Sequence, residues 1–398
     1  MSKGLVAVAM SGGVDSSVAA ALLKEQGYDV VGLTMKLWAC KDLDKEIQTG
    51  KARADMCCSP KDILDAKAVC HRLGIPHYVL EMTERFEQLV IEPFIDTYLA
   101  GLTPNPCVWC NERVKSKDLM QRAKDLGAIG MATGHYARIE KNAAGDRYLL
   151  RAALDNSKDQ TYFMFPLTQD ELAYLRFPLG EVTNKAEVRR IAREIGLVTA
   201  EKHESYEICF VKSGNHRDFL KRHAPDAFVA GDIVSTDGKK LGTHDGAVGY
   251  TIGQRRGIGG GGGTTDPLYV VDVDVINNRV VVGKEEELLY TELFAESMYW
   301  ISYATPPGEF RCKARIRHRG TPQPCTVYAL EEGAGPGTAI LVVFDEPQRA
   351  VAPGQACVLY DDDIVVGGGW IRQVRKPGAN VPPPARLVRP VATQPFTV

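Results

Sequence analysis

The stretch LVAVAMSGGVDSS (residues 5–17) decides the fold, because an apolar run leads through a glycine-rich loop into the helical pattern VAAALLKEQG (residues 18–27). Gly12 and Gly13 let the backbone approach an anion closely, and the N-terminus of the following helix presents N–H groups and a positive dipole end. The order of strand, loop and helix therefore predicts a phosphate site. The alternative is a tight strand-to-helix turn with a Ser or Asp cap.

The loop is not of the Walker type, because no Gly-Lys-Ser/Thr sequence follows it. The string SGGVDSS is similar instead to the PP-loop of enzymes that cleave ATP to AMP and pyrophosphate. Binding of ATP is therefore the first functional prediction.

Composition limits the classes of protein to consider. A length of 398 residues suggests two or three domains, and 48 basic against 50 acidic residues mean that any nucleic-acid surface is local. No apolar run approaches the roughly 18 residues of a membrane span, and the start MSKGLV lacks a signal-peptide layout, so we expect a cytoplasmic protein without a membrane segment. We also expect a monomer. Ten cysteines in that compartment indicate thiols, metal ligands or catalytic groups.

Strand and helix signals alternate in the first half, which predicts an α/β fold with a doubly wound parallel sheet. The similarity of SGGVDSS to the PP-loop implies that this sheet is of the PP-loop ATPase type, like that of the adenine nucleotide alpha hydrolases. The charged, aperiodic residues 39–58 suggest a surface insertion beside the nucleotide. The expected strands are 5–10, 29–35, 77–82 and a return to the sheet in 128–140, and the expected helices are 15–26, 60–73, 158–165 and 184–196.

From about residue 213 the pattern changes to short strands and turns. YVVDVDVINNRVVVG (269–283) predicts two strands joined through Asn277 and Asn278. We expect an ATP-binding catalytic domain (1–212), a small central domain (213–285), an all-β, barrel-like domain (286–385) and a basic proline-rich tail (386–398).

Two cysteines stand in a C-x-x-C pattern within TPNPCVWCNERVK (103–115). A helix that begins near Asn111 would lower the thiol pKa of Cys110, which makes Cys110 a better nucleophile than Cys107. A zinc half-site and incidental packing are the alternatives, although no second ligand pair completes four ligands. Cys209, in EICFV (207–211), is by itself typical of a buried apolar side chain.

The segment FRCKARIRHRG (310–320) alternates strictly between cationic and other side chains, which predicts a strand with one basic face. Such a face suits nucleic-acid phosphates, whereas a solvated charged face is the alternative. The cations of this face are Arg311, Lys313, Arg315, Arg317 and Arg319. Further cations that could extend it are Lys212, Arg217, Lys221, Arg222, Arg372, Arg375, Lys376, Arg386 and Arg389.

Several strings in their order resemble one family, the tRNA-specific 2-thiouridylases (MnmA and, in mitochondria, TrmU), over nearly the whole chain. They are AMSGGVDSS, GLTMK, DAKAVCHRLGIP, TPNPCVWCNERVK, ATGHYAR, KDQTYF, EICFV, YTIGQRRGIG, LYVVDVD and APGQA. The resemblance implies an ATP-dependent tRNA sulfurtransferase. In such an enzyme, adenylation of the C2 oxygen of the wobble uridine precedes displacement of AMP by sulfur.

The resemblance also implies roles for individual residues. Cys209 would carry a persulfide received from a sulfur donor, and Cys110 would release the sulfur or close a disulfide with Cys209. The expected source of the sulfur is a sulfur-donor protein or sulfide. ATP, with Mg2+, would be held by Ala9, Met10, Ser11, Gly12, Gly13, Val14, Asp15, Ser16, Met35 and Gly134. The tRNA would meet Asn105, Pro106, Cys107, His135, Lys158, Asp159, Gln160, Arg317, His318 and Gln355, with Arg315 added from the basic strand.

One departure from the family pattern is Cys107, where many members carry Asp. Cys107, Cys110 and Cys209 together could ligate a 4Fe-4S cluster with one iron open for sulfide, and this hypothesis competes with a persulfide relay. A PP-loop amidotransferase-type synthetase and a non-enzymatic RNA-binding protein are the rival functions.

Overall fold

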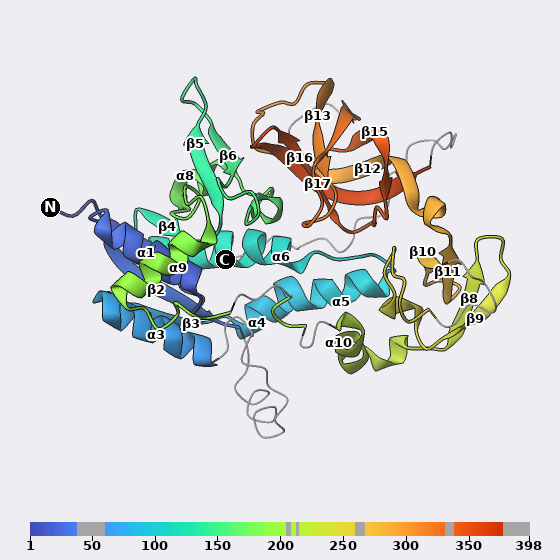
Figure 1. The fold of residues 1–398 in the computed structure, drawn as a ribbon, viewed down its shortest axis with the longest axis horizontal. Helices are drawn as coiled ribbons and strands as arrows, with labels where there is room; N and C mark the ends of the chain where they lie inside the picture. Colours follow the sequence, from blue (N-terminus) through green and yellow to red (C-terminus); the bar gives the residue numbers. More distant parts are fainter. Residues whose placement is uncertain (38–59, 204–207, 212–214, 259–266, 331–337, 377–398) are drawn as a thin grey trace.

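The computed structural model describes residues 1–37, 60–203, 208–211, 215–258, 267–330 and 338–376 (Figure 1). The expected insertion 39–58 and the tail 386–398 lie outside the described residues. No helix in the described ranges is long and apolar enough to cross a membrane.

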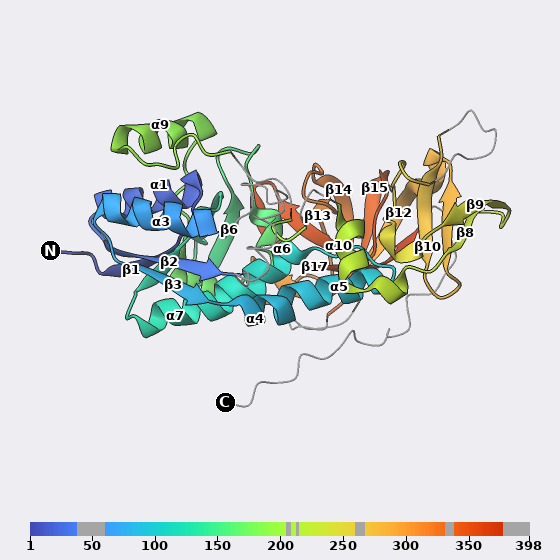
Figure 2. The same ribbon diagram turned by 90° about the horizontal axis from the view of Figure 1, so that it is seen from below.

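The N-terminal half is built on a five-stranded parallel sheet in the order β3-β2-β1-β4-β7, which confirms the expected doubly wound fold. Its central strands are apolar and buried, as in sheets with helices on both faces. Figure 2 shows α1, α3 and α9 on one side of the sheet and α4 and α7 on the other. The strands are β1 (Leu5–Ala9), β2 (Asp29–Lys36), β3 (His77–Glu81), β4 (Gly130–Ala132) and β7 (Leu175–Arg176).

Three helices of this half confirm the expected ones within a residue or two, and α9 buries Val188 and Ala192 on its apolar face. They are α1 (Val14–Glu25), α3 (Pro60–Leu73) and α9 (Lys185–Ile195). The remaining helical segments are α4 (Thr83–Phe86), η1 (Glu87–Ile91), α5 (Glu92–Leu99), α6 (Pro106–Trp109), η2 (Cys110–Leu119), α7 (Met120–Asp125), η3 (Thr161–Phe163), α8 (Gln169–Tyr174), α10 (His216–His223), η5 (Pro225–Ala227), η6 (Ala247–Gly249) and η7 (Glu285–Leu288).

Two expectations for this half are wrong in extent. Of residues 128–140 only β4 joins the parallel sheet, because the chain then leaves the sheet and β5 (Ala137–Lys141) forms a hairpin with β6 (Tyr148–Ala152). The stretch 158–165 contains one 3-10 turn, η3, instead of a helix. Its Asp159 side chain accepts hydrogen bonds from the backbone N–H and the hydroxyl of Thr161, a local alternative to helical bonding.

In the described residues of the second half, the regular structure is β-sheet apart from short helical segments. A four-stranded sheet, in the order β10-β11-β8-β9, contains the expected hairpin, whose turn places Asn278 at φ 51°. Six antiparallel strands then close into a barrel, because β12 pairs with both β15 and β17. The strands are β8 (Gly231–Ser235), β9 (Lys240–His244), β10 (Tyr269–Asp274), β11 (Arg279–Gly283), β12 (Leu289–Trp300), β13 (Glu309–Arg315), β14 (Gln323–Ala329), β15 (Ile340–Arg349), β16 (Ala356–Asp361) and β17 (Ile364–Arg375).

The barrel packs directly on the N-terminal half, beside α6 and the β5–β6 hairpin (Figure 1). β6 pairs with β17, so the hairpin extends the barrel sheet. Asp363 of the barrel forms ion pairs with Arg138 and Arg151 of the hairpin, and the Trp109 and Trp370 rings lie 5.7 Å apart. Buried residues of both halves belong to one hydrophobic core, which fixes the barrel against the helix that carries the C-x-x-C pattern.

Candidate active site

The glycine-rich loop lies between β1 and α1, at the carboxyl end of a central strand. Gly12 has φ +71°, and a Cβ atom there would lie 2.3 Å from the Asp62 carbonyl oxygen, so this position requires glycine. The carbonyl of Gly13, the N-cap residue of α1, accepts hydrogen bonds from the hydroxyls of Ser16 (3.1 Å) and Ser17 (2.8 Å). The loop is therefore folded back on the first turn of α1, the geometry that presents N–H groups to an anion.

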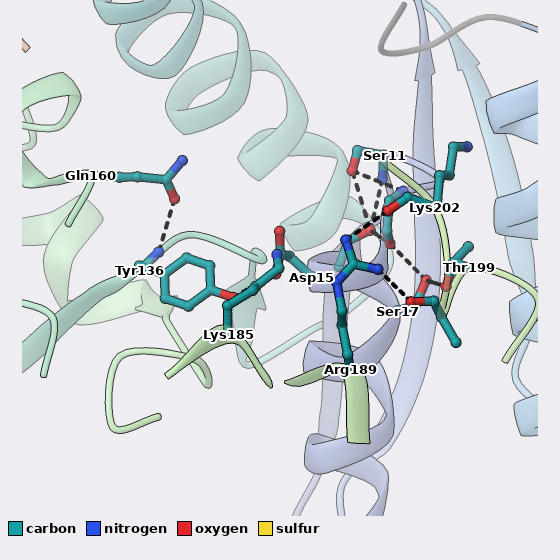
Figure 3. Close-up of polar contacts among 12 residues, drawn as sticks. Ser11, Asp15, Ser17, Tyr136, Gln160, Lys185, Arg189, Thr199 and Lys202 are labelled. Atoms are coloured by element: carbon teal, nitrogen blue, oxygen red, sulfur yellow. Dashed lines mark hydrogen bonds and ion pairs between the residues drawn. The ribbon is translucent and has the colours of Figure 1, made fainter. Parts of the chain in front are cut away.

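Asp15 lies in the first turn of α1 and is the acidic group of this loop. Its Oδ1 accepts hydrogen bonds from the Tyr136 hydroxyl at 2.7 Å and from the Lys185 ammonium at 2.5 Å (Figure 3). The Asp15 side chain is 32% exposed, so it can still reach a ligand. Tyr136 and Lys185 were not among the residues expected at the loop.

Lys202 holds the other side of the loop. Its ammonium donates to the Gly12 carbonyl at 2.9 Å and forms ion pairs with Asp62 and Asp65. Burial opposes the charge, but the hydrogen bonds with both carboxylates outweigh it and raise the pKa of Lys202. Arg189 in turn donates to the Lys202 carbonyl at 2.9 Å (Figure 3). Sequence reasoning missed this lysine, which lies 190 residues from Gly12.

Met35 and Gly134, to which the family resemblance gives contacts with ATP, lie at the carboxyl edge of the sheet. Met35 is near the end of β2 and is 7% exposed. A Cβ atom on Gly134 would come within 2.6 Å of the Ser16 nitrogen and 2.7 Å of the Asp15 carbonyl carbon. The missing side chain at Gly134 thus allows the chain beyond β4 to approach the first turn of α1.

The expected helix start at Asn111 is wrong. The helix begins at Pro106, with Asn105 as its N-cap residue, and passes through Cys110 into the π-helical segment η2. Cys107 therefore lies in the first turn, and Cys110 lies one turn later. The argument that singled out Cys110 from a helix N-terminus applies to Cys107 instead. The case for Cys110 rests on the family resemblance.

Cys110 and Cys209 pack against the same hydrophobic core. Cys209 is partly exposed, and the neighbouring Phe210 lies edge-on to Phe94 at 4.9 Å and tilted to Phe219 at 5.3 Å. Aromatic packing between α5 and α10 thus fixes the backbone next to Cys209. Within the described ranges, no group of three or more His, Cys, Asp or Glu side chains is arranged to hold a metal ion, so the three cysteines do not form a ligand set in this structure.

Most residues expected to contact tRNA have partners inside the protein. The amide of Gln160 accepts from the Tyr136 nitrogen at 3.0 Å, and the His318 ring lies 4.3 Å from that of Phe163. Asp159 and Arg315 form an ion pair, and Gln355 donates to two backbone carbonyls. The backbone nitrogen of Lys158 donates to the Asp155 carbonyl. Asp159, Arg315, His318 and Gln355 thus connect the N-terminal half with the barrel, whereas Gln160 and Lys158 bond within the N-terminal half.

His135 lies in a polar group next to β4. Its Nδ1 is 2.7 Å from the Thr133 hydroxyl, and its Nε2 is 3.3 Å from the Lys115 ammonium. Burial and the charge of Lys115 lower the pKa of His135 well below its usual value. The imidazole is therefore neutral at physiological pH and offers hydrogen bonds without charge.

The predicted basic face does not continue along one strand, and acidic partners are present, contrary to expectation. β13 ends at Arg315, so Arg317 and Arg319 lie beyond the strand. Acidic residues from other parts of the chain pair with the first three cations, namely Asp345 with Arg311, Asp362 with Lys313 and Asp159 with Arg315. Four of the cations thought to extend the face are also paired, Arg217 and Lys221 with Asp245, Arg372 with Glu296 and Arg375 with Glu292. Lys212, Arg386 and Arg389 lie outside the described residues.

An ATP-type loop, two thiols that pack against one hydrophobic core and a fixed barrel define a nucleotide-dependent protein with a second, β-rich region. Three family models match consecutive parts of the chain. Their descriptions are tRNA methyl transferase HUP domain (residues 4–213), tRNA methyl transferase PRC-barrel domain (217–284) and aminomethyltransferase beta-barrel domain (290–371).

Curated relatives match nearly the full length. A tRNA-specific 2-thiouridylase MnmA of Geobacter metallireducens is 49% identical over 367 residues, covering 92% of this chain and 96% of the relative. Proteins with the same name from Clostridioides difficile (45%, covering 92% and 98%) and Rhizobium etli (46%, covering 97% and 94%) match as well. The chain belongs to the tRNA-specific 2-thiouridylase family.

A solved structure of a 4-thiouridine synthetase in complex with RNA and ATP is also similar, with 13% identity and a TM-score of 0.32. The match covers 56% of this chain and 51% of the synthetase chain. Similarity at that level supports no functional argument.

Proposed function

We propose that this protein replaces the C2 oxygen of the wobble uridine in tRNA with sulfur, at the expense of ATP. The observation that carries the proposal is the combination, in a member of this family, of the SGGVDSS loop folded on α1 with two thiols, Cys110 and Cys209, that pack on one core. ATP binding explains the loop, and sulfur transfer explains the thiols.

The loop serves the first half of the reaction. A uracil C2 oxygen is a poor leaving group, and its transfer to the α-phosphate of ATP converts it into part of AMP, with loss of pyrophosphate. The N-terminus of α1 stabilises the negative charge that develops on the phosphates. Asp15 fits a Mg2+ site, because Mg2+ on nucleotides uses one or two carboxylates together with phosphate oxygens. Bound there, Mg2+ would screen the phosphate charge.

The thiols serve the second half. The terminal sulfur of a persulfide on Cys209 attacks C2 of the adenylated uridine, and AMP departs with the former C2 oxygen. The Cys110 thiolate then attacks the Cys209 sulfur, which releases the thiolated uridine and leaves a Cys110–Cys209 disulfide. A thiol reductant returns both residues to thiols. The persulfide comes from a sulfur-donor protein or from sulfide with an oxidant.

The 4Fe-4S hypothesis fits the structure poorly, because the described residues do not bring Cys107, Cys110 and Cys209 together as ligands. No step is therefore assigned to a cluster. In the relay, Cys107 lies in the first turn of α6, next to Asn105 and Pro106, where the target base would be held.

The domain organisation supports the same reaction. We assign catalysis to residues 1–212 and tRNA binding to the central domain (213–285), the barrel (286–385) and the tail. Arg317, which lies beyond the end of β13 and is exposed, is the barrel cation best suited to a phosphate. A monomer located in the cytoplasm suffices for this reaction.

Mass spectrometry of unmodified tRNA after incubation with the protein, ATP, and sulfide together with an oxidant tests the proposal. We expect one uridine to gain sulfur in place of oxygen, and only when ATP is present. A gain of a methyl group with a methyl donor would favour the activity printed for the family models. Transfer of an amide nitrogen would favour the synthetase alternative, and ATP-independent binding without any product would favour an RNA-binding protein.

A further inference from the structure

The string APGQA (352–356) is part of the family resemblance, yet neither the ATP site nor the thiols account for it. It forms the connection between β15 and β16 of the barrel. The 353–356 turn lies against residues 103–105, the loop that leads into α6. All four residues of the turn contact this 103–105 loop or the tyrosine that holds it.

Three contacts join the two segments directly. The Thr103 nitrogen donates to the Pro353 carbonyl at 2.9 Å. Gln355 Nε2 donates to the carbonyls of Thr103 (3.2 Å) and Pro104 (2.9 Å). Gly354 has φ +91°, and a Cβ atom there would lie 2.8 Å from the Thr103 oxygen, so the loop occupies the space that a side chain would need.

A fourth contact runs through Tyr162. Its hydroxyl donates to the Ala356 carbonyl at 3.0 Å, and the Asn105 side chain lies near enough to act on the pKa of that hydroxyl, which burial raises. Tyr162 is fully buried and Asn105 is 7% exposed, so the N-cap residue of α6 is held in place from the barrel side.

The 353–356 turn is itself fixed within the barrel. The Gly354 nitrogen donates to the Ile371 carbonyl, and the Ile371 nitrogen donates to the Gln355 carbonyl, both at 2.8 Å. The turn is therefore bonded to β17 on one side and to the 103–105 loop on the other. The position of the barrel thus determines the position of the start of α6.

We propose that the 353–356 turn positions the start of α6, with Gln355 as the positioning residue that orients Cys107 and Cys110 for the reaction. This inference rests on the proposed function for its catalytic consequence. It differs from the tRNA contact that the family resemblance implies for Gln355, because the side-chain N–H groups already bind the protein backbone. The barrel is then part of the catalytic apparatus as well as of the RNA surface.

Gln355→Met tests the proposal, because methionine has a similar length but no donor. Gln348→Met is the matched control, since Gln348 lies on β15 of the same barrel and donates to the Glu346 carbonyl at its surface. Gln355→Lys restores a long donor that can reach both carbonyls. The loss of two neutral hydrogen bonds should shift the ratio of correctly placed to displaced 103–105 loop by roughly 5- to 150-fold.

Two measurements separate positioning from RNA contact. For Gln355→Met we expect faster alkylation of Cys107 and Cys110 in the tRNA-free protein, followed by mass spectrometry, and a lower thiolation kcat with the tRNA Kd changed less than about twofold. Gln355→Lys should recover part of both losses, and Gln348→Met should match the wild type.

Unchanged alkylation rates in Gln355→Met would overturn the proposal. If tRNA binding were also weaker in this variant, Gln355 would be a tRNA contact. The alkylation result does not require the reaction. If Gln355→Met changes alkylation but the wild-type protein makes no thiouridine, the proposed function fails while the positioning role stands.

Discussion

Replacing Arg315 with methionine should destabilise the protein without weakening its binding to tRNA. The Arg315 and Asp159 side chains are only 14% and 7% exposed, and their charged atoms lie 3.0 Å apart. Removing one partner of a buried ion pair typically costs about 3–5 kcal/mol, because the other charge stays buried. Asp159 keeps its hydrogen bonds from Thr161, which places the expected loss near the lower end of that range.

Urea unfolding measures this loss, and two variants control it. Arg311→Met removes a cation from the same face of β13, but Arg311 is 58% exposed in its pair with Asp345, so we expect a loss below about 1 kcal/mol. Adding Asp159→Asn to Arg315→Met should recover part of the stability. If Arg315 contacted a phosphate instead, Arg315→Met would reduce the slope of the salt dependence of tRNA binding by about one unit. A stable Arg315→Met variant with such a reduced slope would refute the reasoning.

Three further predictions concern the loop, the thiols and one histidine. Lys202→Met should weaken ATP binding, measured by calorimetry, because the Gly12 carbonyl loses its hydrogen-bond donor. The control Lys221→Met, at an exposed lysine, should leave ATP binding unchanged. Equal ATP affinities of the two variants would contradict this prediction. Cys110→Ser and Cys209→Ser should each abolish thiolation and leave the tRNA Kd unchanged, and turnover by either variant would disprove its assignment. Burial, Arg315 and Arg319 lower the pKa of His318 to about 4, so the unfolded chain, with a pKa near 6.5, binds the proton more readily. Folding stability should therefore fall as pH drops from about 6.5 toward 4, and His318→Phe should flatten this part of the urea-unfolding profile; a wild-type slope in the variant would exclude His318 as the cause.

Local patterns predicted the parts of the structure that depend on neighbouring residues. The apolar run 5–10, the two glycines and the helical spacing after Val14 were enough to place the loop between β1 and α1. The alternation in 310–316 predicted a strand, and β13 (Glu309–Arg315) confirms it, with Ala314 buried in the barrel core. These features follow from the period of strands and helices.

Contacts between distant parts of the chain could not be predicted in this way. The acidic partners of Arg311, Lys313 and Arg315 lie 34, 49 and 156 residues away, so the charge pattern alone suggested an unpaired basic face. Lys185 reaches Asp15 across 170 residues for the same reason.

The start of α6 is a different case, because a local signal existed. Asn105 followed by Pro106 is a typical N-cap and first helical position, and the sequence interpretation placed the helix start five residues too late. Because of the prolines before Cys107, the C-x-x-C pattern was interpreted as lying on a turn. The cap signal of Asn105 and Pro106 would have placed Cys107 in the first turn of the helix.

The central claim is that the uridine oxygen leaves as part of AMP after adenylation, and an isotope experiment tests it most directly. The tRNA substrate would carry oxygen-18 at C2 of the wobble uracil, and the AMP formed in one turnover with ATP and a sulfur donor would be examined by mass spectrometry. We predict that the label appears in the phosphate of AMP in proportion to the thiouridine formed. Thiouridine accompanied by unlabelled AMP would contradict the account.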